Sequence, residues 1–270
     1  MQRSDYTAAN RRAWNETAPI HAEQNFARLL ENFQKPGYSL LDEVETAQLN
    51  QLDIKGKQVA QLCCNNGREL LSIKNMGAGR CVGFDISDAF IEQGRQLAAA
   101  GNIDCTLVAT DVYAIPSSYD NSFDLVYITI GALGWLPDLP GFFQIIARLL
   151  KPGGQLFIYE MHPILNMFEG TDQDDPPPLH HSYFRTEPLI DNEGLDYYGF
   201  TTYASAPMYW FPHKMADVIT LCLQNNLQLV AFQEYDHDIS NVFAHFAHFK
   251  TRPPLCYTLI AQKVNATAVS

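Results

Sequence analysis

Two features of this chain could together bind a ligand: a turn closed by a glycine and an acid, each at the end of one of two neighbouring strand-like runs. Gly67 closes a small-residue turn after the apolar run Val59–Cys63 and opens a helical pattern. Asp85 ends the next strand-like run, which begins at Arg80. In such a unit the backbone of the turn approaches a ligand closely, and the acid accepts hydrogen bonds from ribose hydroxyls. The spacing therefore predicts a nucleoside-binding site.

The turn itself has fewer glycines than a loop that binds phosphates. Gly67 is the one glycine where a dinucleotide fingerprint has three, and a pyrophosphate needs that bare backbone. Asn65 stands at a replaced position, and asparagine tolerates left-handed backbone angles best after glycine. The turn therefore favours a nucleoside without phosphates and makes a nicotinamide oxidoreductase the weaker interpretation.

Strand-like and helix-like segments alternate from about residue 57 to residue 160, and they would position the turn and the acid. The expected strands are Val59–Cys63, Arg80–Asp85, Cys105–Ala109, Phe123–Thr129 and Gln155–Glu160. The expected helices are Arg68–Met76, Ala89–Ala100 and Phe142–Leu150. Alternation with short connections predicts an α/β fold with a parallel, doubly wound sheet.

The regular alternation stops after the fifth expected strand. Residues 164–212 combine an acidic, proline-rich run with an aromatic-rich stretch, which predicts an insertion that covers the substrate. A helix at Met215–Gln224 and strands at Leu227–Tyr235 and Leu255–Lys263 follow. No crossover helix separates these two strands, so we expect an antiparallel pair at the sheet edge. Residues 1–270 then form a single domain, with a frayed tail at 264–270.

Composition excludes some partners. The formal charge of −12 gives no basic field for nucleic acid or an anionic membrane surface. The chain has 6 cysteines, and they are scattered without metal-ligand spacing, which favours reduced thiols. The amino terminus lacks a signal-peptide core, and the longest apolar run is too short to span a bilayer. We therefore expect a soluble, cytoplasmic protein that acts on a small molecule.

Five motifs in this order resemble the class I S-adenosylmethionine-dependent methyltransferases. They are Leu62–Gly67, Gly83–Ser87, Ala109–Val112, Phe123–Thr129 and Arg148–Gly154. The resemblance covers roughly residues 40–163 and 213–263, and it implies a Rossmann-like, seven-stranded sheet with an antiparallel last strand. The first motif departs from the family's leucine-glycine-cysteine-glycine-x-glycine loop, because Cys63 and Asn65 replace glycines and Gln61 stands where an acid is common.

The resemblance also implies S-adenosyl-L-methionine as the cofactor and assigns residues to it. Asp85 would bind the ribose and Ile86 would flank the adenine. Asp111 and the amide of Val112 would read the adenine edge. The other residues expected at the cofactor are Leu62, Cys63, Asn65, Gly67, Arg68 and Thr129, with Trp14 and His21 from an amino-terminal cap at 1–40. Arg68 could pair with the cofactor's carboxylate or with a substrate acid.

The histidines supply candidate bases. His162 follows the fifth expected strand, near the expected substrate, and is the first candidate for the catalytic base; His180, His181 and His213 are the other contenders. A second group of histidines and acids, within residues 236–248, matches no standard zinc arrangement, so we expect no metal.

The resulting functional hypothesis is methyl transfer from S-adenosyl-L-methionine to an oxygen or nitrogen of a small metabolite or natural product. The alternatives are a scaffold that binds the cofactor without methyl transfer and a protein methyltransferase. Nothing in the sequence predicts the oligomeric state.

Overall fold

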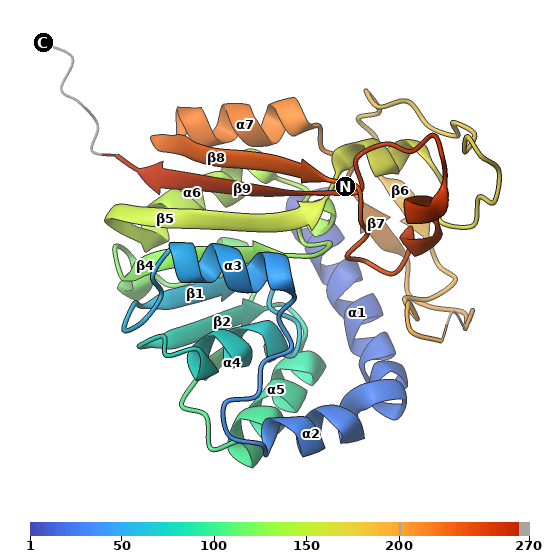
Figure 1. The fold of residues 1–270 in the computed structure, drawn as a ribbon. Helices are drawn as coiled ribbons and strands as arrows, with labels where there is room; N and C mark the ends of the chain where they lie inside the picture. The colour runs from blue at the N-terminus through green and yellow to red at the C-terminus, as the bar shows by residue number, and fades with distance from the viewer. Residues whose placement is uncertain (200, 265–270) are drawn as a thin grey trace, which may run out of the picture.

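The computed structural model describes residues 1–199 and 201–264, and its centre is a seven-stranded sheet with helices on both faces (Figure 1). The strand order is β3-β2-β1-β4-β5-β9-β8. The bounds are β1 Val59–Leu62, β2 Cys81–Asp85, β3 Thr106–Ala109, β4 Phe123–Thr129, β5 Leu150–Met161, β8 Leu227–Tyr235 and β9 Cys256–Lys263. Strands β1 to β5 pair in parallel, whereas β9 runs antiparallel to both β5 and β8. The predicted doubly wound sheet with an antiparallel last strand is confirmed.

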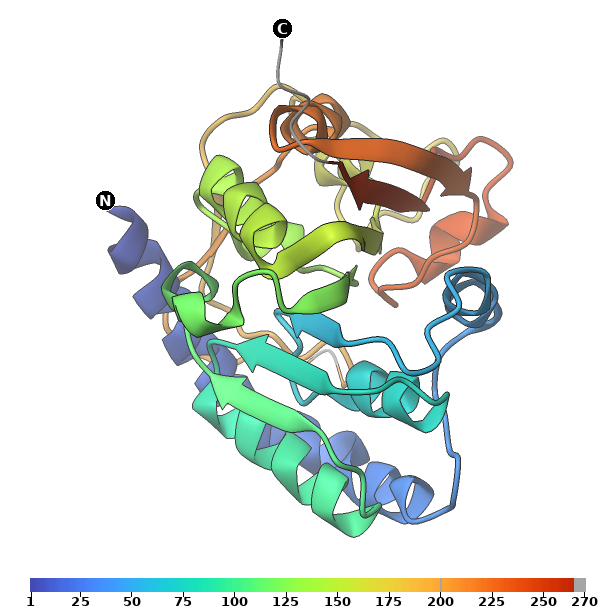
Figure 2. The same cartoon turned by 90° about the vertical axis from the view of Figure 1, so that its left-hand side faces the viewer.

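Each face of the sheet is covered because alternate side chains of the central strands point to opposite sides. On β4, Leu125 and Tyr127 pack toward α3 (Glu43–Gln51), α4 (Arg68–Asn75) and α5 (Asp88–Ala100). Val126 and Ile128 pack toward α6 (Leu139–Leu149) and α7 (Met215–Gln224). Figure 2 shows the twisted sheet between these two layers. Burial on both faces explains why the strand is almost continuously apolar in sequence.

Two boundaries differ from the prediction for local reasons. Helix α6 begins at Leu139, before the predicted Phe142, because the Asp138 side chain caps it by accepting a hydrogen bond from the Gly141 N–H, and Pro140 suits the first turn. Strand β5 begins at Leu150 rather than Gln155, because Leu150 already pairs with Phe123 across a register shift. The Lys-Pro-Gly-Gly turn is therefore an irregular part of the strand.

Residues 164–212 and the β8–β9 loop lie beyond the carboxyl end of β5, whereas the amino-terminal helices pack against α5 (Figure 1). The amino terminus forms α1 (Arg3–His21), which continues through a π-helical turn at Ala22–Phe26 into α2 (Ala27–Phe33). Within residues 164–212, β6 (Leu189–Asp191) and β7 (Met208–Trp210) form a separate antiparallel hairpin that packs beside α1.

Phe200 and residues 265–270 lie outside the described residues, so the predicted frayed tail is described only at Val264. Within the described residues, no helix combines the length and the apolar character needed to cross a membrane.

Candidate active site

A cavity of about 810 Å³ lies at the carboxyl ends of β1, β2 and β4. Its volume is within the roughly 300–1,000 Å³ typical of small-molecule sites. Nine of the residues predicted at the cofactor line it: Trp14, Cys63, Asn65, Arg68, Asp85, Ile86, Asp111, Val112 and Thr129. Residues of the 164–212 segment and of the β8–β9 loop line the same cavity. Sequence segments far apart in the chain therefore enclose one space.

The turn after β1 keeps a glycine-like backbone although two of its positions carry side chains. The φ angles are +55° at Cys63, +51° at Asn65 and +68° at Gly67, all in the left-handed region. The left-handed conformation predicted for Asn65 is confirmed, and its Oδ1 accepts a local hydrogen bond from the Asn66 N–H at 2.8 Å. The backbone follows the glycine pattern, while the cavity is narrowed by the side chains of Cys63 and Asn65.

Asp85 ties the turn to the end of β2. Its Oδ2 accepts a hydrogen bond from the Asn65 N–H at 2.7 Å, and its Oδ1 accepts one from the Ser87 N–H at 2.8 Å. Burial raises the pKa of Asp85 to about 6, against the opposing effect of these backbone donors. Each carboxylate oxygen keeps a second lone pair. When ionised, Asp85 can therefore accept two further hydrogen bonds from a ligand.

Ile86, Asp111 and Val112 form one end of the cavity, beyond Asp85. The Asp111 side chain accepts a hydrogen bond from the Tyr113 N–H at 3.0 Å and so caps the short helical turn Val112–Ala114. Ile86 and Asp111 also line an adjoining groove of about 460 Å³. This end combines apolar surface with a fixed carboxylate, a chemistry that suits a flat heteroaromatic base.

The opposite end, toward β4 and the start of α4, holds an ion pair and two polar atoms without partners among the described residues. The Arg68 Nε donates to Glu69 Oε1 at 2.6 Å, and another guanidinium N–H of Arg68 donates to the Tyr198 hydroxyl. Gln61 Oε1 and Thr129 Oγ1 are buried and have no hydrogen-bond partner among the described residues. Buried polar atoms without partners are rare in native proteins, so these two atoms indicate a polar ligand here.

All 3 tryptophans of the chain line the cavity. The ring centroids of Trp135 lie 5.2 Å from those of both Trp14 and Trp210, and both contacts are edge-to-face. The indole of Trp210 lies so close to Gly134 that an added Cβ there would come within 2.2 Å of the ring. The three indoles form a continuous aromatic wall, and such a wall stabilises a cation held against it.

Helix α1 joins the Asp85 side of the cavity to the hairpin. The Asn10 amide accepts a hydrogen bond from the Tyr209 N–H at 2.8 Å and donates to the Tyr209 carbonyl at 3.0 Å. Further along, the Ser87 hydroxyl donates to Asn15 Oδ1 at 2.6 Å. Trp14, between these two clamps, is thereby held over the cavity.

The fold is similar to that of solved methyltransferases. The S-adenosylmethionine dependent methyltransferase from Mesorhizobium loti gives a TM-score of 0.61 at 18% identity, covering 81% of this chain and 97% of that chain. An S-adenosylmethionine-dependent methyltransferase from Clostridium acetobutylicum gives 0.57 at 12% identity, covering 93% and 99%. At such low identity the likeness concerns the fold alone.

The family model for a methyltransferase domain matches residues 59–154, which include the turn after β1 and Asp85. Residues 59–154 are thus similar to a methyltransferase domain, as the resemblance of the motifs implies. The chain is 35% identical over 124 residues to the 2-phytyl-1,4-naphtoquinone methyltransferase of Synechococcus elongatus, covering 42% of this chain and 52% of that relative. It is 28% identical over 182 residues to the sterol 24-C-methyltransferase erg6 of Aspergillus fumigatus, covering 65% and 46%. The chain thus spans about half the length of these curated relatives.

Three residues that were predicted at the cofactor do not line the cavity. Leu62 is fully buried in the core against the α6 and α7 layer. Gly67 precedes α4, and an added Cβ there would lie 2.9 Å from Leu107. His21 is buried, with its Nε2 2.8 Å from the Leu195 carbonyl. These residues shape or support the lining instead of forming its surface.

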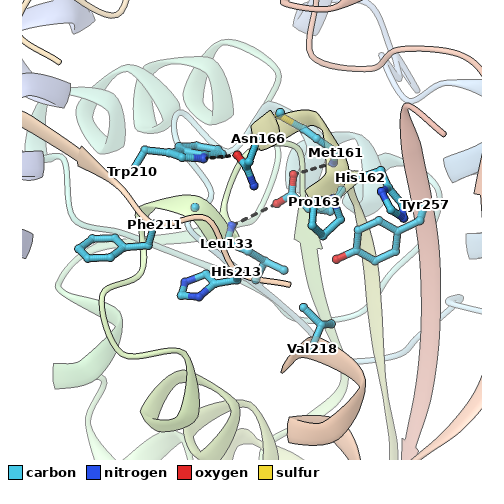
Figure 3. Close-up of a pocket in the computed structure, with 12 residues that line it drawn as sticks. Leu133, Met161, His162, Pro163, Asn166, Trp210, Phe211, His213, Val218 and Tyr257 are labelled. Carbon is cyan, nitrogen blue, oxygen red and sulfur yellow. Dashed lines mark hydrogen bonds between the residues drawn. The ribbon is translucent and has the colours of Figure 1, made fainter. Parts of the chain in front are cut away.

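His162, the first candidate for the catalytic base, does not line the large cavity. It lines an adjoining pocket of about 30 Å³, together with Tyr257 and with Trp210, which lines both spaces (Figure 3). Its Nδ1 accepts a hydrogen bond from the Ile164 N–H at 3.1 Å, and its Nε2 lies 3.0 Å from Glu234 Oε1. Because Nδ1 is the acceptor, Nε2 carries the proton and donates to the carboxylate. Neither nitrogen is free to take a proton from a substrate.

The other candidate histidines also lie outside the large cavity. His180 is 2.8 Å from Asp172 Oδ1, and the Nε2 of His213 is 2.8 Å from the Leu136 carbonyl. The described residues that line the large cavity include no histidine. Across residues 1–199 and 201–264, no cluster of three or more histidines, cysteines or acids is arranged to hold a metal ion.

Several residues that line the cavity were not predicted from the sequence. Glu69, Trp135 and residues 239–243 line the cavity. The β8–β9 loop reaches it because Phe243 and Phe246 pack against Leu165 in a small core of their own. No local sequence pattern predicts that these phenylalanines pack against Leu165. The aromatic-rich stretch, which supplies Tyr197 and Tyr198, was the one signal present in the sequence.

Proposed function

We propose that this chain binds S-adenosyl-L-methionine and transfers its methyl group to a small molecule. The observation that carries the proposal is the continuity of the cavity. One space runs from Asp85, at the nucleoside end, to the aromatic wall and the apolar side chains of the insertion and the β8–β9 loop. A pure cofactor-binding scaffold would have no need of that second half, and its own side chains would fill it.

The residues present fit this cofactor. Asp85 has lone pairs for the ribose hydroxyls, and Ile86 and Val112 provide apolar surface for the adenine. Gln61 Oε1 and Thr129 Oγ1 are buried acceptors that need donors. The turn offers side chains where a pyrophosphate would need bare backbone, which favours this nucleoside over a dinucleotide.

The cofactor, when bound, supplies an electrophilic methyl group on a positively charged sulfur. The protein binds the cofactor and the substrate, orients them toward each other and excludes water. Trp14 and Trp135 line the cavity, where the face of an indole suits a cation, and α1 holds Trp14 over the site through Asn10. We propose that residues 1–40 act as the cap and residues 164–212 as the substrate-side cover of a single domain.

The acceptor half of the cavity suits an apolar small molecule. Its apolar lining is Leu136, Leu165, Phe168, Leu189, Trp210, Ile239, Val242 and Phe243. The relatives named for naphthoquinone and sterol substrates support the same class. The described lining holds no histidine, so an acceptor that is already nucleophilic, such as an ionised phenol or a neutral amine, fits better than an alcohol. This keeps oxygen or nitrogen as the proposed target, with carbon as the alternative that the sterol relative's name favours.

The test begins with calorimetry of the full chain against S-adenosylhomocysteine, with NAD as the control ligand. We expect binding of S-adenosylhomocysteine and none of NAD; the reverse result would overturn the cofactor assignment. Incubation with methyl-labelled S-adenosylmethionine and a fractionated metabolite extract follows. Label in a small-molecule fraction supports the enzyme, whereas cofactor binding without any transfer, from extracts that support other methyltransferases, supports the scaffold.

A further inference from the structure

The strand order determines where the far end of the cofactor would lie. A nucleoside held by Asp85 of β2 and by Asp111, just after β3, lies across one side of the sheet edge. The rest of the cofactor would then extend across β1 toward β4 and the start of α4. Gln61, Thr129, Arg68 and Glu69 line the cavity in that direction. This inference rests on the proposed function, and it concerns what these residues bind.

The amino-acid end of S-adenosylmethionine carries one ammonium and one carboxylate. Arg68 is the one basic side chain among the described residues that line the cavity, and the acid Glu69 follows it directly in the chain. Their side chains are 28% and 8% exposed. Gln61, at the end of β1, is neutral and offers an amide oxygen without charge. This adjacent pair offers one cation and one anion to a ligand end that also carries one of each.

We infer that Arg68 and Glu69 together bind the amino-acid end of the cofactor, with Glu69 accepting from the ammonium and Arg68 donating to the carboxylate. Glu69 thereby supplies the negative charge that the neutral Gln61 cannot. The Gln61 Oε1 adds an uncharged acceptor for a second ammonium hydrogen.

The hydrogen bonds that the pair already makes leave room for this role. The guanidinium of Arg68 has five N–H groups, of which one donates to Glu69 and another to Tyr198. Glu69 uses Oε1 for Arg68, and no side-chain hydrogen bond occupies its Oε2 among the described residues. Both side chains therefore keep free bonding groups while the ion pair holds them in place.

The position at the helix start also argues for a ligand. Arg68 is the first residue of α4, where the helix dipole disfavours a cation, whereas Glu69 in the same turn is favoured. The free energy needed to desolvate a nearly buried ion pair often exceeds the attraction between its charges, so such a pair is seldom explained by stability alone. A zwitterionic ligand adds no net charge to this site, so it can bind without leaving an unpaired buried charge.

A third acid lies behind the site and serves as the control. Glu45 is buried and accepts a hydrogen bond from the Tyr127 hydroxyl, but it does not line the cavity. The negative charge of Glu69 contributes to the raised pKa of Glu45, so the two carboxyl groups are close. Glu45→Gln therefore removes an acid near the pair without removing a proposed cofactor contact.

The experiment uses three nucleosides that differ only at this end. S-adenosylhomocysteine has both charges, its decarboxylated analogue has the ammonium alone, and 5′-methylthioadenosine has neither. Calorimetry measures the dissociation constant of each for the wild type, Glu69→Gln, Arg68→Gln and the control Glu45→Gln. Thermal unfolding of each variant verifies that it is folded.

We expect a crossed pattern. Glu69→Gln should weaken the binding of S-adenosylhomocysteine and of the decarboxylated analogue by about tenfold or more, the scale of a lost charge-assisted hydrogen bond. Arg68→Gln should weaken S-adenosylhomocysteine by a similar factor and leave the decarboxylated analogue unaffected. Neither variant should change the affinity for 5′-methylthioadenosine more than about twofold, and Glu45→Gln should change none of the three. Adding Gln61→Glu to Glu69→Gln should restore part of the lost affinity.

Different binding results would refute this inference and the proposed function. Equal losses for S-adenosylhomocysteine and 5′-methylthioadenosine in Glu69→Gln would make Glu69 a structural residue and refute the inference. Unchanged binding of all three nucleosides in a folded variant would refute it as well. If the wild type binds none of the three, the cofactor assignment itself is wrong.

Discussion

Cofactor affinity should fall as the pH is lowered through 6, because the ribose contact needs an ionised Asp85. Burial raises the pKa of Asp85 from 3.8 to about 6. The proton and the ribose hydroxyls compete for the same carboxylate oxygens, since a protonated carboxyl loses acceptor capacity. The expected direction is therefore weaker binding at lower pH.

The size of the effect follows from the ionised fraction. With a pKa of about 6, about one tenth of Asp85 is ionised at pH 5 and nearly all of it at pH 8. The dissociation constant of S-adenosylhomocysteine should therefore rise about tenfold between pH 8 and pH 5, or about 1.4 kcal/mol. In Asp85→Asn this step should vanish, and the affinity at pH 8 should drop by about 2 kcal/mol.

Quenching of tryptophan fluorescence is the natural assay, because all 3 tryptophans line the cavity. Calorimetry at each pH gives an independent constant, and circular dichroism verifies that the protein is folded at pH 5. A dissociation constant that is the same at pH 5 and pH 8 in the folded wild type would refute the reasoning. So would a pH step of unchanged size in Asp85→Asn.

Three further predictions concern stability. Burial raises the pKa of Glu45 from 4.5 to about 7, so the ionisation of Glu45 lowers the stability of the fold as the pH rises from 4.5 through 7. The Glu45→Gln variant should therefore have a free energy of unfolding up to about 3 kcal/mol higher than the wild type at pH 8. At about pH 4.5 the difference should be small, and urea unfolding measures both. Asn65→Ala should lower that free energy by about 1 kcal/mol, because alanine tolerates a φ of +51° poorly, whereas Asn65→Gly should be nearly neutral. Gly134→Ala should destabilise by about 1–3 kcal/mol and alter the near-ultraviolet circular dichroism, because its Cβ would meet the Trp210 ring. An unchanged urea midpoint in any of the destabilised variants would contradict its argument.

The sequence determined the order of the elements and the conformation of the turn. Apolar runs such as Phe123–Thr129 carry their own signal, because a strand buried on both faces needs apolar residues on both sides. Asn65 could be expected in the left-handed region because that preference belongs to the residue itself. The expectation that Asp85 faces the ligand also follows from local position, at the end of a strand beside the turn.

Only the tertiary structure decided the environment of the remaining groups. His162 follows β5 as expected, yet it lies outside the lining of the large cavity, where Glu234, on a strand 72 positions later in the chain, binds its Nε2. Glu45 is, in sequence, an ordinary acid at the start of a helix, and its contact with Tyr127 of β4 is what buries it. The β8–β9 loop reaches the cavity through the packing of Phe243 against Leu165. These contacts join residues far apart in the chain, and hydrophobic periodicity, which reports only local burial, carries no information about which distant partner a side chain meets.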